Sequence, residues 1–313
     1  MSAFKTPTNV KFRNIQDEVA VIPGSPLMTP LGRGTGVSVY RLKRSPRIGK
    51  IQSPWAVKKV LRNLETKCYA DRLKEEADIL KNLKHPNIVG FRAFVKAEDG
   101  RDCLAMEECD TSIGDLIEQR LDDELGPFPA NHILKVARHI SSALDYLHTE
   151  CHLLHGDIKS MNILVKGDFE VIKLCDFGVS VPLNADGTLK ESRENFIGTE
   201  CWSAPEALSE DGIITHKADI FPFGLVLWEM ISLQIPHMDI LDCDESMNIS
   251  DCTESSSDMS SDFISKFGTR PQLPDTALGD EYKPVIDLFY MCTEENPSQR
   301  PSAKQIIKFL EPA

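Results

Sequence analysis

The sequence lacks the features that mark secreted and membrane-spanning proteins. Its 9 cysteines include no Cys-x-x-Cys pair and show no metal-ligand spacing, which favours a reducing compartment over a disulfide framework. The amino-terminal residues contain no apolar core of a signal peptide, and no apolar run is long enough to cross a bilayer. We therefore expect a cytoplasmic protein, a nuclear protein, or one present in both compartments.

An excess of positive charge is missing as well. Asp and Glu number 48 against 35 Lys and Arg, which gives a formal net charge of −13. Such a chain is poorly suited to neutralising nucleic-acid phosphates, and anionic membrane surfaces repel it. We therefore expect neither nucleic acid nor a membrane as a partner. The length of 313 residues and the hydrophobic content of 41% are ordinary for a globular protein with a sizeable core.

Short strands are expected in the first third of the chain. Segments rich in β-branched and aromatic residues begin at Val37, Trp55, Ile88 and Cys103. Between the second and third of these, residues 72–83 repeat Leu and Ala at helical spacing. The pattern predicts a small sheet with one helix placed against it.

Helices dominate the remainder of the chain. Apolar residues recur every three or four positions through residues 131–148, which is the pattern of a buried stripe on a long amphipathic helix. Residues 218–233 and 283–292 are apolar enough to form buried helices, and short strands return at Ile163 and Val171. A larger helical region therefore follows the sheet.

The pattern predicts an α+β, bilobal protein. We place a β-rich lobe at residues 25–106 and a helical lobe, beginning with a hinge, at residues 107–313. Residues 1–24 lack a sustained apolar period, so a flexible amino-terminal tail is expected. Residues 239–262 are dense in Asp, Glu and Ser, which predicts a mobile acidic insertion and favours a solvated spacer over a specific docking site.

Candidate phosphate-binding residues lie in the β-rich region. Gly32, Gly34 and Gly36 fall in the segment LGRGTGVSVY, where backbone without Cβ atoms can approach phosphate, although glycine clusters are also common in ordinary turns. Lys58 ends an apolar strand, and a charge placed there needs an anionic partner. Glu76, on the helix of residues 72–83, is the candidate partner; the alternative is a surface lysine at a strand end.

The segment HGDIKSMN, residues 155–162, carries the most specific pattern. Asp157 can orient an acceptor hydroxyl and accept its proton, and Lys159 can offset charge on a moving phosphate. Asn162 and Asp176, the latter in an Asp-Phe-Gly triplet, offer oxygens to Mg²⁺, which is a hard cation. One fragment alone could arise by chance, but the ordered set is highly specific.

These motifs together resemble the protein kinase family from about Pro30 to Pro301. The resemblance implies the bilobal protein-kinase fold, Mg-ATP as the phosphoryl donor and protein hydroxyls as substrates. It implies that Asp157 is the catalytic base and that Lys58, braced by Glu76, holds the α- and β-phosphates. It further implies Lys159 as a γ-phosphate contact, Asn162 and Asp176 as metal ligands, and Leu31, Gly32, Gly34, Gly36, Val39, Ala56, Lys58, Met106, Glu107, Cys109 and Leu164 as nucleotide-binding positions.

Further segments narrow the resemblance to a subgroup of mitotic kinases that is placed with the dual-specificity MAP-kinase kinases. The residues that carry it are FKTP at residues 4–7, KRSPR, HPNIVGFRAF, LLHGDIKS and KADIF. It implies Thr6 as a regulatory phosphosite for an upstream proline-directed kinase. Lys159, two residues after the base, resembles Ser/Thr kinases, and phosphorylation of tyrosine as well stays open.

Two departures from common patterns carry expectations of their own. Gly156 replaces the arginine that binds a phosphorylated activation loop in many kinases, which predicts weaker dependence on such phosphorylation. At the carboxyl end, Glu311 stands where a common PDZ ligand needs Ser or Thr, and Pro312 removes a backbone donor. We therefore expect no PDZ binding through this end.

Other functions compete with an active protein kinase. A pseudokinase scaffold would bind nucleotide or partners without catalysis, but it would have no physical reason to keep buried charges that cost desolvation. The polar positions Lys58, Glu76, Asp157, Asn162 and Asp176 are all intact. A small-molecule kinase is a third interpretation, which the Ala-Pro-Glu segment at residues 204–206 and the Ser/Thr-containing loop before it disfavour.

Overall fold

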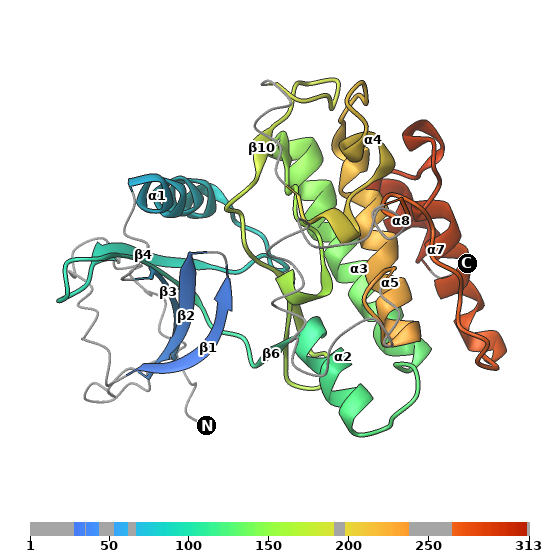
Figure 1. Cartoon of the computed structure of the whole chain (residues 1–313), viewed down its shortest axis with the longest axis horizontal. Coiled ribbons are helices and arrows are strands. Elements are labelled where there is room, and N and C mark those ends of the chain that lie inside the picture. The colour runs from blue at the N-terminus through green and yellow to red at the C-terminus, as the bar shows by residue number, and fades with distance from the viewer. Residues whose placement is uncertain are drawn as a thin grey trace, which may run out of the picture.

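The computed structural model describes residues 28–34, 36–43, 53–61, 67–190, 198–237 and 265–311. Outside these ranges lie the predicted tail at residues 1–24, the predicted insertion at residues 239–262, the predicted phosphosite Thr6, and Pro312 and Ala313. Within them, a β-rich part and a larger helical part lie side by side (Figure 1).

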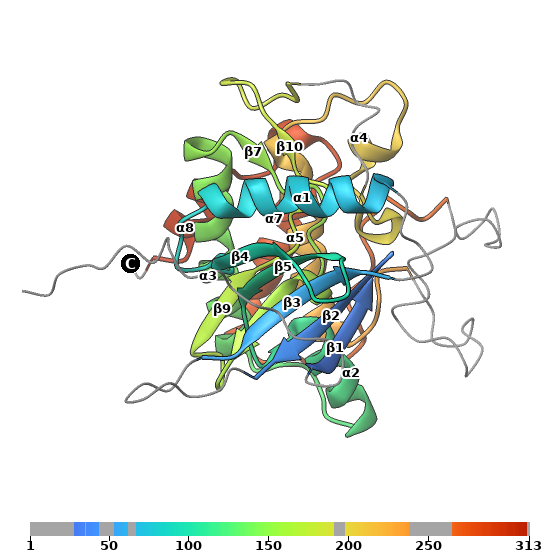
Figure 2. The same cartoon turned by 90° about the vertical axis from the view of Figure 1, so that its left-hand side faces the viewer.

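The β-rich part is a five-stranded antiparallel sheet in the order β1-β2-β3-β5-β4. Its strands are β1 (Met28–Gly34), β2 (Val37–Leu42), β3 (Trp55–Val60), β4 (Phe91–Lys96) and β5 (Asp102–Glu107). The helix α1 (Lys67–Asn82) crosses one face of this sheet (Figure 2). The strands predicted from Val37 and Trp55 begin at these residues, and the predicted helix is confirmed.

Two details of the sheet differ from expectation. The glycine-rich segment forms a strand hairpin, because Gly32 and Gly34 lie in β1 and face Val39 and Val37 of β2. The strand β4 begins at Phe91 and not, as the sequence predicted, at Ile88. Ile88 instead forms an isolated β-bridge with Leu174 of the helical part. Ile88 is therefore part of the connection between the two parts.

Strand alternation assigns each residue of β3 to one face of the sheet. Ala56 and Val60 join the core beneath α1, whereas Val57 packs into a separate apolar cluster on the other face. The same alternation separates two neighbouring lysines. Lys58 points to the face that α1 covers, and Lys59 pairs with Asp99 on the other at 3.3 Å.

The helical part contains the helices α2 (Ile113–Asp122), α3 (Ala130–Asp145), α4 (Pro205–Leu208), α5 (Ile220–Ser232), α7 (Lys283–Cys292) and α8 (Ala303–Phe309). A π-helical turn (Tyr146–Glu150) continues α3. Short 3-10 turns cover Ser160–Asn162, Glu200–Trp202, His216–Ala218, Asp280–Tyr282 and Pro297–Gln299. Small ribbons pair β6 (Thr111–Ser112) with β8 (Ile163–Lys166), β8 with β9 (Val171–Leu174), and β7 (Leu153–Leu154) with β10 (Val181–Pro182).

The core of the helical part is built around α3 and α5. The predicted stripe on α3 is confirmed, since Ile133, Ala137, Ile140 and Leu144 are all fully buried. Every residue of α5 from Ile220 to Ile231 is buried, as expected of a helix that is apolar on all sides. This central helix supplies the anchor points for the polar loops described below.

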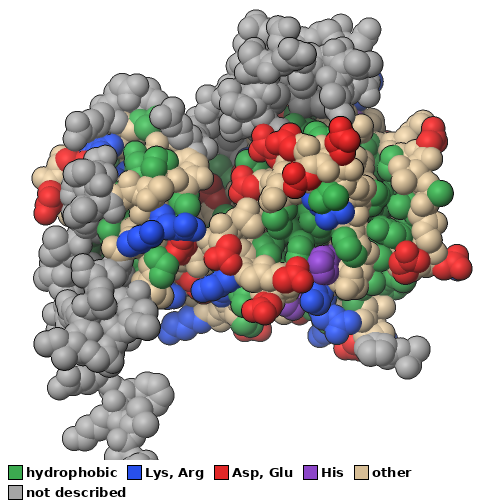
Figure 3. All heavy atoms as spheres, turned by 90° about the horizontal axis from the view of Figure 1, so that it is seen from below, with side chains coloured by type: hydrophobic (Ala, Val, Ile, Leu, Met, Phe, Trp, Pro, Cys, Tyr) green, Lys and Arg blue, Asp and Glu red, His purple; other side chains and the backbone are tan. Residues whose placement is uncertain are grey.

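The arrangement of the described residues confirms the predicted bilobal α+β fold. Acidic and basic side chains are interspersed on the face seen in Figure 3, with an apolar area among them in the larger part. Across the described ranges, no helix combines the length and hydropathy needed to span a membrane. The boundary at residues 106 and 107 between the two lobes stays a prediction.

Candidate active site

The predicted ion pair of Lys58 and Glu76 is present. Lys58 Nζ on β3 donates to Glu76 Oε2 on α1 at 2.9 Å and to Asp176 Oδ1, just after β9, at 2.8 Å. Lys58 and Glu76 are buried, whereas the side chain of Asp176 keeps 40% of its surface exposed. The sheet, α1 and the loop after β9 therefore meet at one ammonium group, with one carboxylate open to a ligand.

The electrostatics of this cluster favour the charged forms of Lys58 and Asp176, whereas burial raises the pKa of Glu76 to about 7. Burial alone would lower the pKa of Lys58, but Asp176 and Glu76 raise it well above its usual value. Burial would raise the pKa of Asp176, yet the Lys58 ammonium outweighs burial and holds that pKa below its usual value. Asp176 also has a φ of 65°, a backbone conformation that costs a non-glycine residue about 1–3 kcal/mol. The ion pair therefore holds a strained residue in place.

A second polar cluster surrounds Asp157. Asn162 Nδ2 donates to the Asp157 backbone oxygen at 2.8 Å and to its Oδ2 at 2.9 Å. Lys159 Nζ lies 3.0 Å from Asp157 Oδ2. A backbone hydrogen bond of 3.0 Å from Cys175 N to Asn162 O joins this cluster to the residue that precedes Asp176. The structure thus brings all five predicted polar residues into one region.

Asp219, at the start of α5, anchors the loop that carries Asp157. Its carboxylate accepts hydrogen bonds from the backbone N–H groups of His155 and Gly156, each at 2.9 Å, and lies 2.8 Å from His148 Nε2. His155 Nε2 lies 3.0 Å from Cys175 O, and its ring packs edge-on against Phe177. These contacts give His155 a packing role in the loop.

Thr199 is a site residue that the sequence did not single out. Its Oγ1 donates to Asp157 Oδ1 at 2.5 Å and accepts from Lys159 Nζ at 2.9 Å. The hydroxyl therefore ties the segment before α4 to the candidate base. Thr199 was expected only as one of several hydroxyl residues of a loop, because a contact between positions 157 and 199 leaves no local pattern.

Glu229 is a second site residue that the sequence analysis missed. This α5 carboxylate is buried, and both of its oxygens are occupied: Ser160 Oγ donates to Oε1 at 2.7 Å and Trp202 Nε1 to Oε2 at 2.8 Å. Ser160 belongs to the loop of Asp157, and Trp202 to the segment before α4. A charged residue inside an otherwise apolar helix was the available signal.

Glu229 makes the stability of the protein depend on pH. Burial raises its pKa to about 7 from 4.5, so the folded protein takes up a proton here and stability is lost as pH rises from about 4.5 to 7. In Glu229→Gln the amide oxygen can accept from Trp202 while the amide nitrogen donates to Ser160 Oγ. The free energy of unfolding of this variant, relative to that of wild type, should rise by roughly 2 kcal/mol from pH 5 to pH 8, since one pKa unit is worth about 1.4 kcal/mol. Urea unfolding across this range measures the difference, and parallel curves contradict it.

The predicted nucleotide-binding residues lie along the sheet and the connection to the helical part. Ala56 and Met106 are partners across β3 and β5, and Val39 of β2 is the partner of Lys58. Ala56, Met106 and Cys109 are buried, Val39 and Leu164 are partly buried, and Leu31 is 42% exposed. A Cβ added to Gly32 would meet no atom within 4 Å. The Glu107 carboxylate lies 3.2 Å from Nζ of Lys173 in β9 and accepts from Gly90 N at 3.1 Å.

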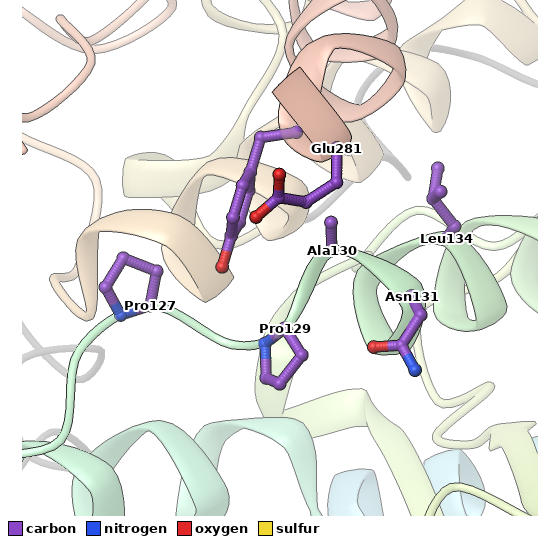
Figure 4. A pocket seen from close by; sticks show the side chains of 7 residues that line it. Pro127, Pro129, Ala130, Asn131, Leu134 and Glu281 are labelled. Carbon is purple, nitrogen blue, oxygen red and sulfur yellow. The ribbon is translucent and has the colours of Figure 1, made fainter. Parts of the chain in front are cut away.

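A pocket of about 460 Å³ lies elsewhere, between the start of α3 and the turn before α7. Pro127, Pro129, Leu134 and Glu281 are among the residues around it (Figure 4). None of its lining residues belongs to the two polar clusters. The chemistry proposed below therefore does not use this pocket.

A match to a known protein family shows which family this chain belongs to. The protein kinase domain family matches residues 27–309, nearly the whole described chain. The chain belongs to the protein kinase family. The bilobal fold is the protein-kinase fold, and the roles that the family resemblance implied for Lys58 and Asp157 stay predictions.

Individual relatives agree with this assignment. The Lymphokine-activated killer T-cell-originated protein kinase of Homo sapiens is 48% identical over 99% of this chain and 98% of its own length. The Mitogen-activated protein kinase kinase kinase ANP1 of Arabidopsis thaliana is 31% identical over 78% of this chain and 33% of its own. The Dual specificity protein kinase shkA of Dictyostelium discoideum is 30% identical over 82% and 44%. The narrower resemblance, to the PDZ-binding kinase or T-LAK cell-originated protein kinase, is confirmed by the first of these.

The residues of this kinase fit the ATP and divalent metal that its family uses. Asp176 and the amide of Asn162 supply the oxygen donors that Mg²⁺ prefers, and Mg²⁺ in such sites commonly takes only one or two protein ligands beside substrate phosphates. Among the described residues, no group of three or more His, Cys, Asp and Glu side chains could hold a metal ion by itself. The donor set therefore suits a metal that arrives with a phosphate ligand.

Proposed function

We propose that this kinase transfers the γ-phosphate of Mg-ATP to serine and threonine hydroxyls of proteins. The observation that carries the proposal is the convergence of two polar clusters. One holds Lys58 between Glu76 and Asp176, and the other holds Asp157 with Asn162 and Lys159. These residues come from separate elements, so only the fold brings them together.

Each residue has a chemical role in this proposal. Bound Mg-ATP supplies the transferable phosphoryl group and the cation that offsets its charge. Asp157 orients the acceptor hydroxyl and takes its proton, while Lys159 balances negative charge beside it. Asn162 and Asp176 hold the cation, and Lys58, fixed by Glu76, holds phosphate. The adenine ring of the nucleotide is enclosed by Leu31, Val39, Ala56 and Leu164. Its phosphates are covered by Gly32, Gly34 and Gly36. The connection between the lobes, at the edge of the adenine, is formed by Met106, Glu107 and Cys109.

Several observations support serine and threonine as acceptors. Lys159 follows Asp157 by two residues, and Thr199 binds both of them from the segment before α4.

The names of relatives include a dual-specificity kinase and a mitogen-activated protein kinase kinase kinase. From the narrower resemblance of the sequence we also propose a role in mitosis or MAP-kinase signalling in the cytoplasm or nucleus, and Thr6 as the target of an upstream proline-directed kinase.

A pseudokinase scaffold is the competing proposal. It is disfavoured because Lys58 and Glu76 are buried and fully engaged, an arrangement whose desolvation cost is offset only by well-placed partners. The Asp157 side chain likewise has three neighbouring donors. These features suit a charged ligand and a reacting hydroxyl.

Phosphotransfer with identification of the product tests the proposal. The purified chain is incubated with labelled Mg-ATP and casein, and the labelled amino acids are separated after hydrolysis. We expect phosphoserine and phosphothreonine. Label on tyrosine to a comparable extent would establish dual specificity, and binding of nucleotide without any transfer would favour the scaffold.

A further inference from the structure

Tyr69, in the first turn of α1, lies against the glycine-rich hairpin. A Cβ built on Gly36 would come within 2.4 Å of Cε1 and 2.6 Å of Cδ1 of the Tyr69 ring. Real Cβ atoms essentially never show such contacts, so the ring fills the space that a side chain at position 36 would need. Gly36 also has a φ of 74°, which side chains rarely adopt. The residue type at position 36 and the ring at position 69 therefore fit one another.

The contact links the hairpin to the helix that carries Glu76. Tyr69 and Glu76 are seven residues apart, which is close to two turns of an α-helix, so both lie on one face of α1. Leu73, between them, is buried in the core beneath the sheet. On the hairpin side, the Gly36 carbonyl accepts a hydrogen bond of 3.0 Å from Leu61 N, just after β3. Gly36 is thus fixed from both β3 and α1.

We propose that Tyr69 is a positioning residue that holds the glycine-rich hairpin of β1 and β2 against α1, ready for nucleotide. The inference rests on the proposed function, because the hairpin matters only if it covers phosphates. A hairpin ordered before binding loses less conformational entropy when nucleotide arrives. The ring also makes the hairpin follow α1, so the hairpin and the Glu76 side chain that braces Lys58 move together.

Calorimetric titration with Mg-ADP, which permits no turnover, measures this role. Freeing the hairpin multiplies the affinity for Mg-ADP by the fraction of molecules still in the competent state, so we expect Tyr69→Ala to weaken Mg-ADP binding about tenfold. Tyr69→Phe keeps the ring and should stay within about twofold of wild type. The matched control is Ile79→Ala, which removes another partly buried residue of α1 from the same core and should leave Mg-ADP affinity within about twofold.

A double-mutant cycle tests the contact itself. Added to wild type, Gly36→Ala should weaken Mg-ADP binding about tenfold, because the new methyl group meets the Tyr69 ring. Added to Tyr69→Ala, it should weaken Mg-ADP binding only about threefold further, because backbone strain alone remains. Hydrogen exchange of residues 36–39 should rise in Tyr69→Ala and not in Ile79→Ala. Equal penalties of Gly36→Ala in both backgrounds, or unchanged affinity in Tyr69→Ala, overturn the role of Tyr69. A wild-type protein that fails to bind Mg-ADP overturns the proposed function instead.

Discussion

Asp157→Asn should lower kcat for phosphotransfer about a thousandfold, within the range of 10²–10⁴ that a positioned general base contributes. The substitution keeps the shape of the side chain, and Asn162 can still donate to the backbone oxygen of residue 157. It removes the carboxylate that would accept the hydroxyl proton and that Lys159 and Thr199 contact. Because Asp157 is not expected to hold nucleotide, KM for ATP should change by less than about threefold.

A steady-state assay with ATP varied at saturating protein substrate separates these two effects. Asp168→Asn is the control, since this aspartate is 86% exposed and lies outside both polar clusters. It should retain wild-type kcat and KM. Equal rates for wild type and Asp157→Asn would remove Asp157 from the chemistry, and a large rise in KM with unchanged kcat would make it a binding residue.

Arg300→Ala should destabilise the folded protein by about 3–5 kcal/mol, the cost of breaking a buried ion pair by removing one member. Arg300 and Glu206 are both buried and form two parallel hydrogen bonds of 2.7 and 2.8 Å. Arg300 also donates to the backbone oxygens of Lys217, Glu294 and Glu295. Its removal takes two hydrogen bonds from the Glu206 carboxylate and one from each of three backbone carbonyl groups. Chemical unfolding of the full chain measures the loss.

Two further variants sharpen this test. Lys96→Ala breaks a pair with Asp102 in which the lysine is 70% exposed, and it should cost less than about 1 kcal/mol. Replacing both partners by apolar residues, as in Arg300→Met with Glu206→Leu, should restore part of the stability, because no uncompensated charge is left. An Arg300→Ala protein as stable as Lys96→Ala would show that the buried pair contributes little.

Much of the fold could be predicted because its local patterns are strong. The stripe of Ile133, Ala137 and Ile140 repeats at helical spacing, and burial of that stripe is what stabilises α3. The strand β1 was missed because its glycines and proline have low strand propensity. Its pairing with β2, from Met28↔Leu42 to Gly34↔Val37, overrides that propensity.

The candidate site could be predicted only in part, for a related reason. Lys58, Asp157 and Asp176 stand in short motifs with fixed spacing, so they can be found from the sequence. The contacts of Thr199 and Glu229 join residues tens of positions apart, as in the pair of Ser160 with Glu229. Such contacts depend on how α5 and the segment before α4 pack, and no local period records them.

Magnesium dependence of ATP binding tests most directly whether the two polar clusters form one site for a metal-bound triphosphate. Calorimetric titration of ATP with and without Mg²⁺ is made on wild type and on Asp176→Asn. In wild type Mg²⁺ should strengthen ATP binding at least about tenfold, within the 5–150-fold span of typical coupling between ligands, and in Asp176→Asn most of that gain should vanish. An Asp176→Asn protein whose ATP affinity responds to Mg²⁺ as strongly as wild type would contradict the site.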